Sequence, residues 1–117
     1  MKIVKQFGNV TMELESDTQI GLVDEIIKHN DVFGNDKCGK CNSDNISFTR
    51  RDVDGDIYYE IRCNKCGAKL ALSQHREGNT LYPKRKAGKN DSTGLEKGEW
   101  LPDGGWVKWD KELQKEV

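Results

Sequence analysis

The chain has 117 residues, of which 34% are hydrophobic and 33% are charged. This length suits one compact domain or a small domain with appended segments, and the low apolar content predicts a thin core. Thin cores are commonly stabilised by disulfides or by a metal ion. Residues 1–10 lack the apolar run of a secretory signal, and no stretch approaches the roughly 20 apolar residues that cross a bilayer. We therefore expect a cytoplasmic protein with reduced thiols and no membrane partner.

Charge is unevenly distributed along the chain, although the net value is only −1. Residues 1–36 carry −4, residues 37–89 carry +6 and residues 90–117 carry −3. The positive segment contains all four cysteines. Its positive charge favours an anionic partner for that region. The sequence pI of about 6.1 is nevertheless lower than that of a dedicated nucleic-acid domain.

Residues 1–36 are predicted to form a strand and helix unit. Val10, Met12 and Leu14 alternate with polar residues, as in a strand whose core face is apolar. Residues 8–9 interrupt the alternation, so we expect either a strand pair or one broken strand.

A helix is expected to follow, from about Thr18 to His29. Ser16 or Asp17 is a candidate N-cap, and Gly34 and Asn35 are expected to end the helix. The predicted buried face consists of apolar residues at three-to-four spacing, namely Ile20, Val23, Ile26 and Ile27.

Three short strands are predicted around two pairs of cysteines. Residues 45–52 and 57–62 alternate between apolar and polar side chains, and Asp54-Gly55 is a typical tight turn between antiparallel strands. A third strand is expected over residues 69–73, after the second cysteine pair.

The four cysteines form two Cys-x2-Cys pairs with 21 residues between them: Cys38, Cys41, Cys63 and Cys66. A two-residue spacer lets one tight turn present two sulfurs to one ion, and four thiolates at about 2.3 Å complete a tetrahedron around zinc. Asn42 and Gly67 tolerate the positive φ that such turns need. We therefore predict one structural Zn2+, with disulfides, free thiols or bound iron as alternatives. Because a closed four-thiolate site cannot activate water, we do not expect an enzyme.

The order of knuckle, hairpin, knuckle and strand predicts an α+β fold. Residues 37–86 are expected to form a small zinc ribbon with a three-stranded antiparallel sheet, two Cys-x2-Cys knuckles and a basic extension, after the N-terminal strand-helix unit at 1–36. Residues 87–99 are rich in Gly, Lys and Asp and are predicted to be a flexible linker. Order is expected to resume in residues 100–117, which carry Trp100, Trp106 and Trp109.

Basic and aromatic side chains are interleaved across and beyond the predicted sheet. Cations that follow a phosphate backbone, together with rings on which bases stack, are typical of single-strand binding. The alternative is an ordinary solvated face with a basic tail. The candidate nucleic-acid-binding residues are Arg51, Tyr58, Arg62, Lys69, Arg76, Tyr82, Lys84, Arg85 and Lys86.

The segment from Asp52 to Lys86, with the later motif GGWVKW at Gly104 to Trp109, is similar to small zinc-ribbon proteins of bacteriophages and prophages. Such proteins are often encoded among recombination and replication genes. The resemblance implies an accessory role with single-stranded DNA as partner. It also implies a working surface that includes Gly78, Tyr82, Pro83, Lys84 and Arg85.

A protein-interaction adaptor or inhibitor is the second hypothesis, since zinc ribbons also serve as docking modules. The segment with Trp100, Trp106 and Trp109 would then anchor the chain on a host or phage enzyme, because Trp side chains dominate the energetics of interfaces. The acidic pI favours this hypothesis, whereas the positive middle segment favours DNA.

Overall fold

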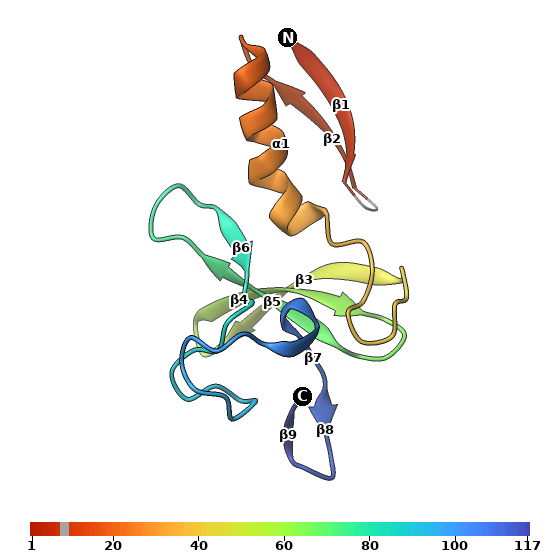
Figure 1. Cartoon of the computed structure of the whole chain (residues 1–117), viewed down its shortest axis with the longest axis vertical. Coiled ribbons are helices and arrows are strands. Elements are labelled where there is room, and N and C mark those ends of the chain that lie inside the picture. Colours follow the sequence, from red (N-terminus) through yellow and green to blue (C-terminus); the bar gives the residue numbers. More distant parts are fainter. Residues whose placement is uncertain (8–9) are drawn as a thin grey trace. The chain divides into compact units, whose positions relative to one another are not determined.

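The computed structural model describes residues 1–7 and 10–117 of the chain (Figure 1). The fold is α+β, with helix α1 and antiparallel sheets, and the chain divides into two compact units, Met1–Asp36 and Lys37–Val117. The predicted strand break at Gly8 and Asn9 lies outside the described residues. Within those residues, no helix combines the length and the apolar character needed to cross a membrane.

The N-terminal unit consists of β1 (Lys2–Phe7), β2 (Val10–Glu15) and α1 (Gln19–Phe33). The two strands are antiparallel, which confirms the predicted strand pair. Phe7, Leu14 and Leu22 form the buried core between the strands and the helix. Ile26 packs partly buried against this core.

Helix α1 begins at a different cap from the predicted one. Thr18, instead of Ser16 or Asp17, is the N-cap, and its hydroxyl accepts a hydrogen bond from the Gly21 N–H at 3.0 Å. This bond satisfies one of the free N–H groups of the first turn. The predicted end at Gly34 is confirmed.

The predicted buried face of α1 is wrong at three of its four positions. Ile20, Val23 and Ile27 are 77%, 52% and 63% exposed. The helix carries two apolar stripes, and the sheet of only two strands covers the one that contains Leu22 and Ile26. Spacing alone does not distinguish two such stripes, because both recur at helical intervals.

The C-terminal unit is built on an antiparallel sheet of five strands: β3 (Ile46–Val53), β4 (Asp56–Cys63), β5 (Lys69–Gln74), β6 (Leu81–Pro83) and β7 (Trp106–Val107). The first three are the predicted strands. Asp54 and Gly55, at φ of 53° and 88°, form the predicted turn between β3 and β4. The prediction of three strands is corrected, because β6 and β7 both pair with β5. These two strands are too short to produce a periodic pattern.

The core of the C-terminal unit lies on one face of this sheet. Ile61 and Leu70 face each other across β4 and β5 and are fully buried, and Trp106 lies opposite Leu70 on β7. Trp106 is only 4% exposed, so it is a core residue and does not form part of an exposed anchor. Trp100 and Trp109 are 68% and 55% exposed.

The remaining elements are the 3-10 turn η1 (Pro102–Gly105) and the hairpin of β8 (Trp109–Asp110) and β9 (Lys115–Glu116). Residues 87–99 form a closed loop whose ends meet, because the Ala87 N–H donates to the Glu99 carbonyl at 2.8 Å. Ala87 and Thr93 are buried within the C-terminal unit. The flexibility of this segment stays a prediction.

Candidate metal centre and nucleic-acid interface

The two cysteine pairs converge on one point. All four sulfur atoms lie within 4.8 Å of one another. Cys38 Sγ is 3.6 Å from Cys66 Sγ, and Cys41 Sγ is 3.5 Å from Cys63 Sγ. A tetrahedron with metal-to-sulfur distances of about 2.3 Å has edges of about 3.8 Å, so the cluster has the size of a four-thiolate metal site. All four are free thiols, and the set fits zinc without identifying the metal.

The local backbone explains why each pair presents both sulfurs together. Asn42 and Gly67 adopt φ of 61° and 81°, as predicted for the tight turn of each knuckle. Within the turns, the Lys40 N–H lies 3.3 Å from Cys38 Sγ and the Cys66 N–H lies 3.4 Å from Cys63 Sγ. Such donors stabilise thiolate over thiol.

The pKa values of Cys63 and Cys41 are shifted in opposite directions. The N–H of Cys66 lowers the pKa of Cys63, and despite burial the pKa falls to about 6. The N–H of Ser43 lowers the pKa of Cys41, but burial and the neighbouring thiols outweigh it and raise the pKa to about 11. A metal ion that binds the cluster would therefore displace protons from the thiols. Its affinity would decrease as the pH is lowered.

The C-terminal segment packs directly against the first knuckle. A Cβ atom at Gly39 would lie 2.5 Å from Cδ1 of Trp106, so only glycine leaves room for the indole. Beside it, Lys40 Nζ and Asp103 Oδ2 form an ion pair of 2.5 Å. Sequence reasoning missed the contact between Gly39 and Trp106, because no local pattern links two residues so far apart in the sequence.

Five of the predicted nucleic-acid-binding residues lie on one face of the sheet. Arg51 is paired with Tyr58 and Arg62 with Lys69 across neighbouring strands, and paired side chains point to the same side. Tyr82 on β6 joins the same face through its pairing with β5. The Arg51 guanidinium lies 5.3 Å from the centre of the Tyr58 ring.

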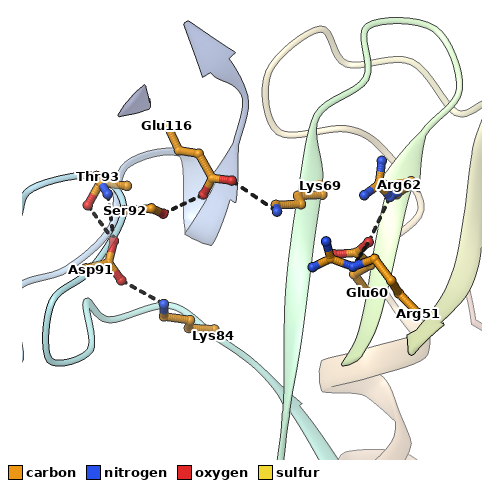
Figure 2. Close-up of polar contacts among 9 residues, drawn as sticks. All are labelled: Arg51, Glu60, Arg62, Lys69, Lys84, Asp91, Ser92, Thr93 and Glu116. Atoms are coloured by element: carbon orange, nitrogen blue, oxygen red, sulfur yellow. Dashed lines mark hydrogen bonds and ion pairs between the residues drawn. The ribbon is translucent and has the colours of Figure 1, made fainter. Parts of the chain in front are cut away.

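Most cations of this face are paired with carboxylates, as Figure 2 shows. Glu60 is 3% exposed and lies 3.8 Å from Arg51 and 2.8 Å from Arg62. A buried carboxylate is stable only with such partners. Glu60 lies on the polar face of β4, where the two arginines cover it.

Lys69 of this face, and Lys84, which follows β6 and borders the same face, are held by residues from later in the chain (Figure 2). Lys69 pairs with Glu116 at 3.0 Å, and Lys84 pairs with Asp91 at 2.7 Å. Burial alone would raise the pKa of Asp91, but hydrogen bonds from Lys84 and Thr93 outweigh it and hold that pKa well below its usual range. These lysines are therefore less available to a phosphate than the sequence suggests.

Two neighbouring hollows lie along this part of the sheet. One, of about 440 Å³, is lined by Tyr58, and the other, of about 450 Å³, is lined by Tyr82 and Trp100. Both are bordered by Ser73 and Lys84, so they are neighbours on the surface. We call these two neighbouring hollows together the sheet-face groove.

Trp100 was not among the predicted nucleic-acid-binding residues. Its ring lies 4.6 Å from Lys86 Nζ, and Arg85 and Lys86 line the same hollow. A backbone bridge between Lys86 and Trp100, with the Leu101 N–H donating to the Arg85 carbonyl at 2.8 Å, anchors this position. The basic run and the exposed ring thus form one surface.

Arg76 lines neither hollow of the sheet-face groove. It lines a third hollow, which shares Tyr59 and Gln74 with the hollow that Tyr58 lines.

No protein-family model, curated protein or solved structure matches this chain. The resemblance to phage zinc-ribbon proteins is therefore supported by no relative. The function has to be inferred from the cysteine cluster and the sheet face.

Proposed function

We propose that the C-terminal unit is a zinc ribbon that binds single-stranded DNA, as a cytoplasmic accessory protein of phage recombination or replication. The observation that carries the binding proposal is the sheet-face groove. Three exposed rings lie along it, namely Tyr58, Tyr82 and Trp100. The phage setting rests on the sequence resemblance alone.

The groove offers both components of single-strand recognition. Its rings can each stack on a base, which is worth about 1 to 3 kcal/mol per base. Arg85 and Lys86 have no ion pair with any described carboxylate, so they are available to phosphates. Lys69 and Lys84 would have to exchange a carboxylate for a phosphate, which limits the affinity.

Zinc has a structural role in this proposal. Bound to four thiolates, it would cross-link the two knuckles and contribute directly to the free energy of folding. Because no coordination position stays open, we propose a binding protein and not an enzyme.

Fluorescence anisotropy with labelled single- and double-stranded oligonucleotides at low and moderate salt tests the proposal. Joint charge reversal of Arg85 and Lys86 should weaken binding to all sequences and reduce the salt slope by roughly 0.7 per lost phosphate contact. Trp100→Ala should cost about 1 to 3 kcal/mol and leave that slope nearly unchanged. Trp109→Ala is the matched control, because Trp109 is exposed but does not line the groove.

Two results would contradict the proposal. One is no binding to either strand form at low salt by protein that is folded and zinc-loaded. The other is an equal loss of affinity in Trp100→Ala and Trp109→Ala, since the groove would then have no special role.

A second candidate is a zinc-ribbon adaptor or inhibitor that docks on a host or phage enzyme. The exposed Trp109 and Leu113, on and beside the β8–β9 hairpin, favour it. Trp106 is buried and is not available as an anchor. The adaptor predicts no oligonucleotide binding and a loss of enzyme binding in Trp109→Ala but not in Trp100→Ala.

A further inference from the structure

Helix α1 of the N-terminal unit displays an apolar stripe on its outer face. Ile20, Val23 and Ile27 are each more than half exposed, at 77%, 52% and 63%. Their spacing of three and four residues aligns them along one side of the helix. Single exposed aliphatic side chains are ordinary, but a continuous row of β-branched residues marks an interaction surface.

Two acidic residues border this stripe, and the exposed Lys28 lies four residues after the first and three before the second. Asp24 and Asp31 follow Ile20 and Ile27 by four residues each, so each lies one turn further along the same side of α1. Both are exposed, and neither carboxylate forms an ion pair with a described cation. The unit as a whole carries −4.

The stripe has the pattern of one side of a coiled coil. Ile20, Val23 and Ile27 occupy successive positions of the apolar seam, and Asp24 and Asp31 occupy a flanking position, where charge selects the partner helix. We propose that this α1 outer face docks a basic amphipathic helix of another protein, with apolar residues at the same spacing and Lys or Arg beside them.

Charge complementarity favours a basic helix over a second copy of the chain, anionic lipid or nucleic acid as the partner of this face. A second copy of the chain would bring its own two aspartates against Asp24 and Asp31, which is repulsive. Anionic lipid and nucleic acid are repelled by the same carboxylates. A cationic helix instead covers the apolar stripe and pairs with both aspartates. The proposal is independent of the sheet-face groove, because it concerns the other unit.

The test uses two synthetic amphipathic helical peptides with Ile and Leu at the seam, one flanked by Lys and the other by Glu. Amide chemical shifts of isotope-labelled, zinc-loaded full-length protein report where each peptide binds. The Lys peptide should bind α1 about tenfold or more tightly than the Glu peptide. Ile27→Lys should weaken this binding by about tenfold or more, whereas Val4→Lys, at a 71% exposed position on β1, should leave it unchanged.

Charge reversal gives the sharpest version of the test. The double variant Asp24→Lys and Asp31→Lys should no longer bind the Lys peptide and should bind the Glu peptide instead. A merely structural role for these residues would not produce this exchange. All substituted side chains are exposed, so the thermal melting should be preserved.

Four outcomes would overturn the proposal. The two peptides bind equally well, or neither shifts α1 signals at millimolar concentration. Sedimentation shows a dimer that Ile27→Lys abolishes, so that a second copy is the occupant. Ile27→Lys alone shifts the signals of residues 37–117, so that the chain itself covers the stripe.

Discussion

Replacing Trp106 with alanine tests whether the C-terminal segment stabilises the metal centre. The side chain is 4% exposed, its backbone pairs with Leu70, and its indole packs against Gly39 in the first knuckle. Truncating a buried Trp typically costs about 3 to 5 kcal/mol. A small domain has only about 5 to 15 kcal/mol of stability, so a large share of it would be lost. Since the knuckle loses its cover, zinc should also be released faster.

Urea unfolding followed by circular dichroism measures the first effect, and transfer of zinc to a chromophoric chelator measures the second. Trp109→Ala is the control, because at 55% exposure its unfolding free energy should change by no more than about 0.5 kcal/mol. Trp106→Ala within about 1 kcal/mol of this control, with an unchanged rate of zinc release, would refute the reasoning.

Three further substitutions test other parts of the structure. Cys63→Ser leaves three thiolates, so metal analysis should find zinc lost and the C-terminal unit unfolded; one firmly bound zinc per chain would contradict this. Ile26→Asp should destabilise the N-terminal unit by on the order of several kcal/mol in thermal melting, and an unchanged melt would refute the packing. Asp91→Asn should cost about 1 to 3 kcal/mol at neutral pH. Because the pKa of Asp91 is lowered by folding from about 3.9, this difference in urea unfolding should be constant from about pH 8 to 5 and close only below about pH 4; a change near neutral pH would contradict it.

The cysteine cluster and the three central strands were predictable because their signals are local. A two-residue spacer fixes the turn that joins Cys38 to Cys41, and Asp54-Gly55 fixes the turn between β3 and β4. The alternation along these strands also placed Arg51, Tyr58 and Arg62 on one face correctly.

The other features depend on contacts between distant residues. Trp106 reaches Gly39, Glu116 reaches Lys69, and no local pattern encodes either contact. Burial of Glu60 needed both arginines in place, which alternation alone does not predict. On α1, two apolar stripes recur at helical intervals, and a hairpin of two strands covers only one of them, which local spacing does not identify.

Binding of a single strand along the sheet-face groove is the central claim, and nuclear magnetic resonance tests it most directly. Isotope-labelled, zinc-loaded protein is titrated with unlabelled oligothymidylate at low salt while the three Trp indole N–H signals are followed. The predicted result is a progressive shift of the Trp100 indole and of the Tyr58, Ser73 and Tyr82 amides, with the buried Trp106 and the outlying Trp109 indoles unmoved. An unmoved Trp100 indole at saturating oligonucleotide would contradict the claim.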